Sequence, residues 1–385
     1  MSEYRTIREL CSIVVDCPHS TPTWTSEGKI VVRNNNIKNG RIDLSSPSYT
    51  DEEHFLQRIK RAVPQPGDLI ITREAPIGDV GMIPEGVECC LGQRMVLLRA
   101  DSSICDNYYL LYSLQSRYVQ HQISWSEGTG TTVSNLRIPH LEQIKIPYLP
   151  LPKQKAIASV LRSLEEKMSI NRKINDNLQQ QAMALYASMF LDNLALETTA
   201  GTLKDIADIT MGQSPSGSSY NEDGNGEVFY QGRAEFGYRF PTRRLYTTEP
   251  KRMAEAGDVL LSVRAPVGDL NVAYERCCIG RGLGAIHGRN GYQSFVLYTL
   301  FALRPQLDVY NGEGTVFGSI NRNALNDMPI DIPSEEAIAA FEAVVRPMDN
   351  MIRSNYEENC RLQELRDSLL PRLMSGEVDV SDIQL

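Results

Sequence analysis

The chain carries the same sequence pattern twice. Residues 67–71 (GDLII) and 75–79 (APIGD) return as residues 257–261 (GDVLL) and 265–269 (APVGD), an offset of 257 − 67 = 190 positions. Further matches follow in the same order, at offsets that fall to 188 and then to 186. Such an ordered, slowly changing offset indicates one duplicated unit whose loops gained or lost a few residues. Two copies of one unit with different loops can bind two different targets.

Length and composition bound the class of protein. A chain of 385 residues is long enough for two domains of about 100–200 residues, each with its own core. With 42% hydrophobic and 23% charged residues, the composition is that of an ordinary soluble globular protein. The sequence has no run of about 18 apolar residues, and its first residues lack an apolar signal core. We therefore expect a cytoplasmic protein without a membrane span.

The net charge argues against a simple basic DNA-binding protein, but the charge is unevenly distributed. The whole chain carries −9, and residues 334–385 contain 11 acidic and 5 basic residues, which amounts to 5 − 11 = −6. Residues 1–333 therefore carry only −9 + 6 = −3. A segment so close to neutral can still present local basic surfaces.

The cysteines and histidines do not form a ligand pattern. The eight cysteines include one adjacent pair in each repeat, Cys89-Cys90 and Cys277-Cys278, and no CxxC motif. Neighbouring residues of a strand point to opposite faces, so these pairs are typical of a half-buried strand rather than of a metal or redox site. The five histidines show no spacing such as HxxxH. We expect neither a metal site nor a bound cofactor.

Each repeat is dominated by strand-like runs punctuated by Gly, Pro and Asn, with one short helical stretch inside it. This pattern predicts an α+β fold with loop-rich connections, and loops on a rigid scaffold usually carry the recognition residues. The expected strands are residues 30–33, 68–72 and 95–98 in the first repeat and 228–230 and 258–262 in the second, and the expected helical stretches are 108–120 and 294–303.

A long helix with a coiled-coil seam follows each repeat. The seam residues recur in steps of four and three, the spacing of a helix packed along a second helix. Two Asn interrupt each apolar seam in the same layers, because 355 − 171 and 359 − 175 both equal 184. A buried Asn without a partner costs about 1–3 kcal/mol, whereas two facing Asn satisfy each other and fix the helix register. The seams are Ile157, Leu161, Leu164, Met168, Asn171, Asn175, Leu178, Ala182, Leu185 and Met189, and Phe341, Val345, Met348, Ile352, Asn355, Asn359, Leu362, Arg366, Leu369 and Leu373.

The order along the chain predicts that the two helices are antiparallel. The first helix ends beside the start of the second repeat, and the second helix begins where that repeat ends. Asn171 is then expected to face Asn359, and Asn175 to face Asn355. The first seam spans 189 − 157 = 32 steps, which is about 48 Å at ~1.5 Å per residue. The helices would act as a spacer with one globular unit at each end.

Further features recur at the borders of the repeats. Each copy leaves its last strand at a proline, Pro147 or Pro333, and the first helix begins with residues 151–157 (LPKQKAI). Together with GDLI at 67–70 and GDVL at 257–260, in the order unit–helix–unit–helix, these features resemble the specificity subunit of a type I restriction–modification enzyme. The resemblance covers nearly the whole chain.

Two positions depart from the pattern of that family. An acidic residue usually precedes the Gln of the helix entry, and Lys153 stands there in this chain. The second copy reads SEEAI at residues 334–338 and has no Gln.

The resemblance implies an α+β protein with two duplicated α/β target-recognition domains joined by a long antiparallel coiled coil. Each domain would read half of a split sequence in double-stranded DNA, and the helices would dock two methyltransferase subunits and, in the larger assembly, restriction subunits that translocate and cut DNA. Such a subunit is not itself an enzyme, and the sequence contains neither a GxxxxGK[ST] phosphate loop nor an Asn-Pro-Pro-aromatic methylation motif. The expected domains are 1–150 and 199–333 for target recognition, 151–198 for the first spacer helix, and 334–385 for the second spacer helix and the C-terminal tail.

Side chains suited to DNA follow equivalent strands in the two repeats. Base edges are read by Arg, Asn and Gln presented from loops, and phosphates take Lys, Arg and backbone amides. Different residues at matched places are what readers of two different half-sites require. The candidates are Arg33, Asn34, Asn35, Asn36, Lys38, Arg41, Arg73, Gln93, Arg94 and Thr129 in the first repeat, and Gln231, Arg233, Arg243, Arg244, Arg264, Arg281 and Thr315 in the second.

Each candidate also has an ordinary structural interpretation. Residues 33–36 (RNNN) are equally typical of an Asn-rich turn, and the Gly-Thr pairs at 128–129 and 314–315 of plain turns. Arg73 and Arg264 both follow the repeated strand and precede Ala-Pro, one residue apart in register, and either can be a solvated charge.

Two other functions stay open on the sequence. A protein-binding adaptor with two domains and no DNA readout fits the near-neutral repeats. An enzyme with a site between the repeats would use the repeated carboxylates, although Gly-Asp before a strand or in a turn suits backbone capping better. Co-purification with a methyltransferase would separate these hypotheses from a DNA reader. The repeated carboxylates are Asp68, Asp79, Asp258 and Asp269.

Overall fold

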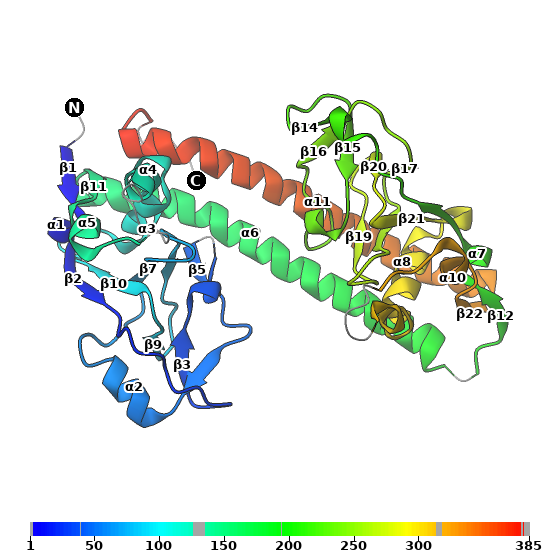
Figure 1. Ribbon diagram of the computed structural model, residues 1–385, viewed down its shortest axis with the longest axis horizontal. Coiled ribbons are helices and arrows are strands. Elements are labelled where there is room, and N and C mark those ends of the chain that lie inside the picture. The colour runs from blue at the N-terminus through cyan, green and yellow to red at the C-terminus, as the bar shows by residue number, and fades with distance from the viewer. Residues whose placement is uncertain are drawn as a thin grey trace. The chain divides into compact units, whose positions relative to one another are not determined.

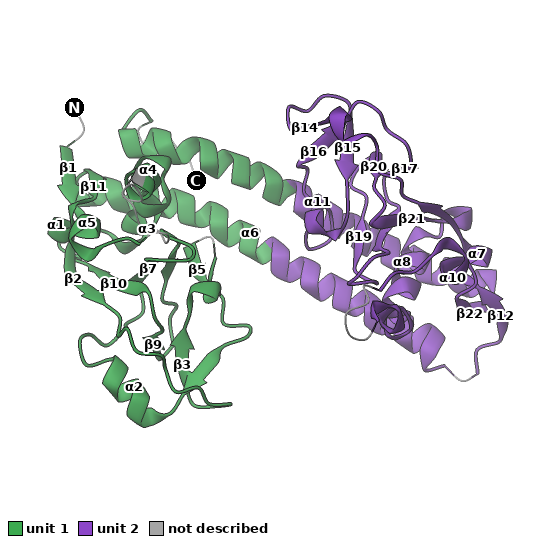
Figure 2. Ribbon diagram, in the orientation of Figure 1, with its two compact units in different colours: residues 1–170, 358–385 green, residues 171–357 purple. Residues whose placement is uncertain are grey.

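The computed structural model describes residues 3–38, 40–125, 135–193, 195–312, 318–378 and 380. The chain divides into two compact units (Figures 1 and 2). Unit 1 consists of Met1–Ile170 and Glu358–Leu385, and unit 2 of Asn171–Glu357. Each unit contains one repeat together with part of both long helices. The domain boundaries expected at residues 150, 198 and 333 stay a prediction.

Unit 1 is built on a six-stranded sheet in the order β2-β10-β7-β8-β5-β4 and a three-stranded sheet in the order β6-β3-β9. A third sheet pairs its first strand, β1, with its last, β11. The strands are β1 (Glu3–Thr6), β2 (Cys11–Asp16), β3 (Lys29–Val32), β4 (Ile37–Lys38), β5 (Gly40–Ile42), β6 (Ser48–Thr50), β7 (Leu69–Thr72), β8 (Val80–Met82), β9 (Cys89–Leu91), β10 (Met95–Ala100) and β11 (Lys145–Tyr148). The short helices are α1 (Ile7–Leu10), η1 (Asn34–Asn36), α2 (Glu52–Arg58), α3 (Asn107–Gln115), α4 (Arg117–Trp125) and α5 (Ile138–Gln143).

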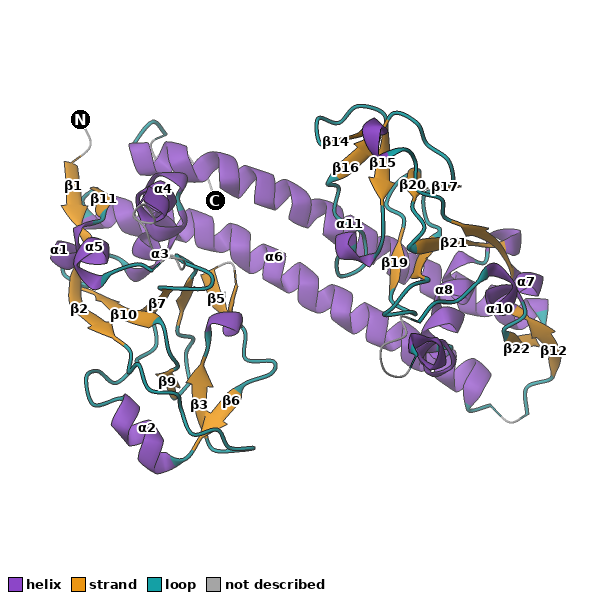
Figure 3. Cartoon of the chain, viewed as in Figure 1, coloured by secondary structure: helices purple, strands orange, loops and turns teal. Residues whose placement is uncertain are grey.

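Unit 2 repeats this plan with a four-stranded sheet, β13-β21-β18-β19, a five-stranded sheet, β14-β16-β15-β20-β17, and the pair β12-β22 (Figure 3). The strands are β12 (Thr198–Thr202), β13 (Ala207–Met211), β14 (Tyr220–Asn221), β15 (Glu227–Tyr230), β16 (Leu245–Thr247), β17 (Met253–Ala254), β18 (Val259–Ser262), β19 (Leu270–Val272), β20 (Cys277–Ile279), β21 (Leu283–Gly288) and β22 (Pro329–Pro333). The short helices are α7 (Leu203–Ile206), η3 (Gly217–Ser219), η4 (Arg233–Glu235), η5 (Arg289–Gly291), α8 (Gln293–Ala302), α9 (Arg304–Asp308), η6 (Val309–Asn311) and α10 (Arg322–Asn326).

The duplication is present in the backbone connections. In both units the antiparallel ladder runs through three equivalent strands, β2-β10-β7 and β13-β21-β18. In both units the second sheet contains a parallel strand pair, β3 with β9 in unit 1 and β15 with β20 in unit 2. The predicted α+β class with two duplicated domains is confirmed.

The repeated Gly-Asp strand lies at the centre of each core. β7 and β18 are buried along their whole length, because apolar clusters cover both faces of the sheet. A strand buried on both faces reads as a continuous apolar run, which is what GDLII and GDVLL show.

The cysteine pairs are more deeply buried than the sequence predicted. Cys89 is 1% exposed and Cys90 0%, because Phe55 of α2 covers the second face of β9. The expectation of a half-buried strand was therefore wrong. Burial raises the pKa of Cys89 to about 12 and that of Cys90 to about 11, so both thiols stay protonated. Among the described residues no group of three or more His, Cys, Asp or Glu is arranged to hold a metal ion.

The long helices are α6 (Leu151–Tyr186), extended by the π-helical turn η2 (Ala187–Leu191), and α11 (Glu335–Ser375). Within unit 1, Leu161 of α6 shares a core with Leu373 of α11. Within unit 2, the ring centroids of Tyr186 and Phe341 lie 5.6 Å apart. In each unit a late residue of one helix thus contacts an early residue of the other, which confirms the antiparallel arrangement. In the part of the chain that is described, neither helix is apolar enough over 18 residues to span a membrane.

One of the two predicted Asn contacts lies inside a single unit. In unit 2, Nδ2 of Asn355 donates to Oδ1 of Asn175 at 2.8 Å, and Nδ2 of Asn175 donates to the carbonyl oxygen of Ile352 at 3.3 Å. This is the contact that the antiparallel register predicts. Asn171 and Asn359 belong to different units, so their facing stays a prediction.

Candidate nucleic-acid interface

Parallel strand pairing brings the predicted loops of unit 1 together. Strands β3 and β9 run parallel, with Val32 opposite Leu91, so their carboxyl ends meet at one edge. The amide of Gly92 donates to the carbonyl oxygen of Val32 at 2.8 Å, which places residues 33–36 beside residues 92–94. Together these loops line one open pocket, whose members include Trp24, Arg33, Asn34, Asn35, Gln93 and Arg94.

Unit 2 builds the same junction with other side chains. Strands β15 and β20 run parallel, with Tyr230 opposite Ile279. The amide of Gly282 donates to the carbonyl oxygen of Gln231 at 3.3 Å, so Gln231 and Arg281 leave neighbouring strand ends. Both side chains are exposed. The matched positions predicted from the sequence are therefore matched in space.

Within the loops of unit 1, some candidates are exposed and others hold the loop in shape. Arg33 and Asn35 are exposed. Asn36 is buried: its Oδ1 accepts from the amide of Arg33 at 2.8 Å and its Nδ2 donates to the carbonyl oxygen of Asp43 at 2.9 Å. The amide groups of Asn34 and Gln93 likewise donate to backbone carbonyls, those of Glu74 and His19. These three residues position the loop that presents Arg33 and Asn35.

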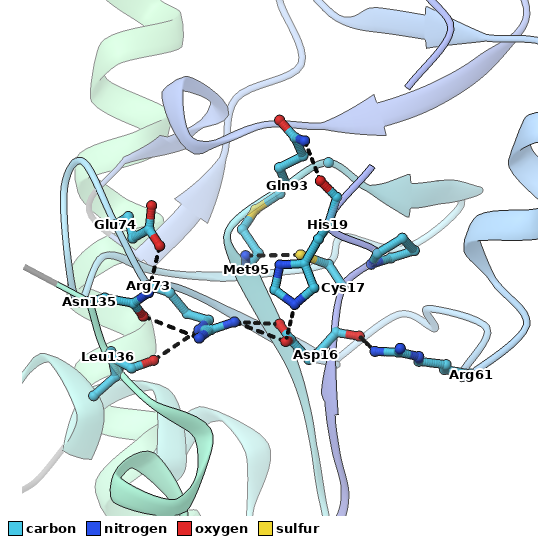
Figure 4. Close-up of polar contacts among 12 residues, drawn as sticks. Asp16, Cys17, His19, Arg61, Arg73, Glu74, Gln93, Met95, Asn135 and Leu136 are labelled. Atoms are coloured by element: carbon cyan, nitrogen blue, oxygen red, sulfur yellow. Dashed lines mark hydrogen bonds and ion pairs between the residues drawn. The ribbon is translucent and has the colours of Figure 1, made fainter. Parts of the chain in front are cut away.

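Arg73 is held inside the protein (Figure 4). It is 9% exposed, and its Nη1 lies 2.9 Å from both carboxylate oxygens of Asp16. Its Nε donates to the carbonyl oxygen of Leu136 at 2.8 Å, and its Nη2 to Oδ1 of Asn135 at 3.1 Å. Every face of the guanidinium fork is thus occupied, and Arg73 ties β2 and the segment at residue 135 to the end of β7.

The one-residue register difference between Arg73 and Arg264 is also present in the structure. The amide of Arg73 donates to the carbonyl oxygen of Arg94, and the matching bond in unit 2 runs from Val263 to Gly282. Val263 is therefore the counterpart of Arg73. Arg264, one residue later, is exposed, so the register difference seen in the sequence separates a buried side chain from an exposed one.

Arg41 is also engaged within unit 1. Its Nη1 donates to Oγ of Ser169 at 2.8 Å and its Nη2 to the carbonyl oxygen of Glu165 at 3.0 Å. Both partners lie on α6, so Arg41 ties β5 to that helix. Lys38 is exposed and pairs with Asp43 at 3.2 Å.

Most of the other candidate cations are exposed and paired with carboxylates. Ion pairs between exposed groups are worth only about 0–1 kcal/mol, so a DNA phosphate can replace such a carboxylate at little cost. The Arg244 pair is different, because its partner Glu235 is buried. Partial burial acts to lower the pKa of Arg243, but the hydrogen bond and charge of Glu275, together with the nearby Tyr230 and Tyr246, outweigh it and raise the pKa. The pairs are Arg94–Glu74 at 3.2 Å, Arg243–Glu275 at 2.5 Å, Arg244–Glu235 at 2.7 Å, and Arg233–Asp269.

Comparison with known proteins decides the family. The type I restriction modification DNA specificity domain matches residues 2–180. The specificity subunit named for the type I restriction enzyme MjaX of Methanocaldococcus jannaschii is 27% identical over 403 residues, which cover 98% of this chain and 94% of that one. The MjaIX specificity subunit of the same organism is 21% identical over 353 residues, 82% of this chain and 79% of its own.

A solved structure agrees in fold. The type I restriction-modification S subunit from M. genitalium is 18% identical, and the alignment covers 96% of this chain and 95% of that one with a TM-score of 0.57. Residues 2–180 belong to the family of type I restriction modification DNA specificity domains, and over nearly its whole length the chain is similar to type I specificity subunits. A specificity subunit recognises DNA and is not itself a catalyst, so the predicted family and function class are confirmed.

Two predicted contacts of the specificity subunit cannot be placed. Thr129 and Thr315 lie outside the described residues. One residue that was not predicted joins the site: Trp24 lines the pocket beside Arg33. Trp24 has no match in the second repeat, so the duplication gave no signal for it. Its only mark in the sequence is that the chain contains just two Trp.

The repeated carboxylates of the specificity subunit have structural partners. Oδ2 of Asp68 accepts from the amide of Gln65, and Oδ2 of Asp258 from the amide of Glu255, each at 2.8 Å. Backbone capping was thus the right interpretation for this pair. The carboxylate of Asp269 forms ion pairs with Arg233 and Arg304. Burial raises the pKa of Asp79, the fourth of the set.

Proposed function

We propose that the subunit reads a bipartite target in double-stranded DNA, with one half-site bound by each unit. The observation that carries this proposal is the pair of parallel strands in each unit, which end at one edge and present different side chains from matched loops. One scaffold with two sets of exposed Arg, Asn and Gln suits two different base sequences.

The exposed members of the site are the proposed contacts. In unit 1, Arg33, Asn35 and Arg94 face solvent near the strand ends, and in unit 2, Gln231, Arg264 and Arg281 do so. We assign base readout to these side chains. The exposed cations Lys38, Arg233, Arg243 and Arg244 are assigned to phosphates. The partners of the first three are partly exposed carboxylates that a phosphate can replace, whereas Glu235, the partner of Arg244, is buried and keeps its ion pair.

We further propose that the subunit works in the cytoplasm with two methyltransferase subunits, and with restriction subunits in the larger assembly. Family membership supports DNA and methyltransferase as partners. The number two follows from the duplication, because two copies of one fold offer two copies of one docking surface.

The helices are proposed to set the distance between the half-sites. Both α6 and α11 run without interruption from one unit into the other. One added heptad in each helix lengthens it by about 10 Å, or roughly 3 base pairs. The expected result is a longer unread gap between two unchanged half-sites.

The test is genome-wide mapping of methylation in cells that express this chain with its methyltransferase. The expected motif is asymmetric, with two short half-sites around an unread gap. Asn35→Ala and Arg94→Ala should change bases of one half-site, and Gln231→Ala and Arg281→Ala bases of the other, at about 1–3 kcal/mol for each base contact. Arg289→Ala, which removes an exposed ion pair with Asp208, is the matched control and should change neither. A continuous motif, or variants of both units that alter the same bases, would contradict the proposal.

A further inference from the structure

Trp24 presents an exposed aromatic ring beside the loop after β3. Its side chain is 45% exposed, although a large apolar ring usually lies inside a protein. The backbone on either side is fixed: the amide of Thr25 donates to the carbonyl oxygen of Tyr49 at 3.1 Å, and Oγ1 of Thr50 donates to the carbonyl oxygen of Thr23 at 2.8 Å. The ring is thus held at the surface by a rigid frame.

The Arg33 guanidinium lies over this ring, 5.1 Å from its centroid, which is within the range of a cation–π contact. The backbone of Arg33 is fixed as well, because its amide donates to Oδ1 of Asn36 at 2.8 Å. In the described part of the chain no carboxylate lies within ion-pair distance of Arg33, and its guanidinium has a polar contact with Oγ of Ser48 at 3.4 Å. Arg33 thus carries an exposed charge that is oriented by a ring and not neutralised by an acid.

A guanidinium that lies on an aromatic face keeps its N–H groups directed outward, in the plane of the fork. That fork matches O6 and N7 of guanine, the commonest specific contact of Arg in the major groove. We propose that Trp24 is a positioning residue that holds Arg33 for a bidentate contact with one guanine of the first half-site. The inference rests on the proposed function and names one base of its target.

The second unit provides an internal contrast. Arg233, which begins the short helix η4 in the loop after β15, is paired with the carboxylate of Asp269. A guanine contact that depends on an aromatic residue is therefore expected in the first half-site and not at the matching place in the second.

The experiment uses the complete complex with its methyltransferase on a DNA library in which every half-site position is varied. Arg33→Ala should lower the preference for guanine at one position of the first half-site by about 5- to 150-fold. Trp24→Ala should lower it at the same position by between about twofold and thirtyfold, whereas Trp24→Phe should keep most of it, because a ring face remains. Arg33→Lys keeps the exposed charge but lacks the fork, and should lose the same preference. Leu56→Ala, at an exposed apolar residue of α2, is the control and should change nothing.

The outcomes separate this inference from the proposed function. If the Arg33 and Trp24 variants weaken methylation of all sequences equally, Arg33 binds phosphate and the guanine assignment is overturned, while the bipartite target stands. If Trp24→Phe loses as much as Trp24→Ala, positioning by the ring is overturned. If the unchanged complex reads no split motif, the proposed function itself fails.

Discussion

The two units contain equivalent buried aspartates, Asp68 and Asp258, whose carboxylates contact different basic side chains. In unit 1, both carboxylate oxygens of Asp68 accept from Arg99, at 2.7 and 2.8 Å. In unit 2, Asp258 contacts Nδ1 of His287 at 2.6 Å, and an imidazole is charged only when it is protonated. The bond that both units keep is the one from a backbone amide to the aspartate. The comparison teaches that the backbone geometry around this aspartate is shared, while the side chains that support it have diverged.

The junctions between the repeats and the helices show the same divergence. In unit 1, Gln154 of α6 is fully buried; its Oε1 accepts from the amide of Asp106, and its Nε2 donates to two backbone carbonyls. In unit 2, Glu342 of α11 accepts from the amides of Ser294 and Phe295 at the start of α8. Equivalent helices are thus held by a neutral amide in one unit and by a carboxylate in the other.

The largest expected effect concerns Arg73 of unit 1, whose counterpart in unit 2 is Val263. Arg73→Ala leaves the carboxylate of Asp16 without its main partner and should destabilise unit 1 by about 3–5 kcal/mol. The matching change, Val263→Ala, removes only apolar contacts and should cost less. Native-state hydrogen exchange of amides in β7 and β18 measures both. A loss below about 1 kcal/mol at Arg73 would show that the buried ion pair is dispensable.

The next effect concerns the helix junctions. Gln154→Ala removes the partners of one buried amide and two buried carbonyl groups, and should destabilise unit 1 by about 2–4 kcal/mol. Glu342→Gln keeps an oxygen that can accept from α8 and should cost about 1 kcal/mol in unit 2. Exchange rates of amides in α3 and α8 report the two effects separately. Equal losses for both variants would mean that the two junctions are the same in energy despite their different chemistry.

A smaller effect is expected at the contact between Asn175 and Asn355, which tests the helix register in unit 2. Asn175→Leu should cost about 1–3 kcal/mol, because it leaves the buried Asn355 amide without its partner. The double variant with Asn355→Leu should recover most of that loss or exceed the original stability, since apolar residues replace both members of the pair. Chemical denaturation of the two single variants and the double variant gives the coupling. If the two changes are simply additive, the contact does not contribute to the register.

The smallest expected effect concerns the side chains that contact Asp68 and Asp258. Arg99→Ala should destabilise unit 1 by about 1–2 kcal/mol, because the Asp68 carboxylate loses two charged hydrogen bonds. His287→Ala should cost less than about 1 kcal/mol, because a largely exposed imidazole contributes little to its partner. Native-state hydrogen exchange of amides in β10 and β21 measures the loss of stability for each variant. A larger loss for His287 than for Arg99 would reverse the comparison.

Much of the architecture could be predicted from the sequence, because its signals are local or periodic. The duplication, the α+β class, the antiparallel helices and the contact between Asn175 and Asn355 follow from repeated residues and from the spacing of the seams. The position of the candidate loops after β3 and β15 also followed, since a strand and the loop after it are neighbours in the chain. The sequence also placed Arg73 and Arg264 one residue apart in register, and the backbone hydrogen bonds identify Val263 as the counterpart of Arg73.

Which candidate side chains are free was decided by the tertiary structure. Arg73 is occupied by Asp16, 57 positions away, and Arg41 by Ser169, 128 positions away. Trp24 enters the site because the fold places it beside Arg33. An Arg in a loop has the same local sequence whether it binds DNA or a distant carboxylate, so composition and spacing cannot distinguish the two. That choice depends on packing between segments far apart in the chain, where burial and ion pairing decide which charges remain exposed.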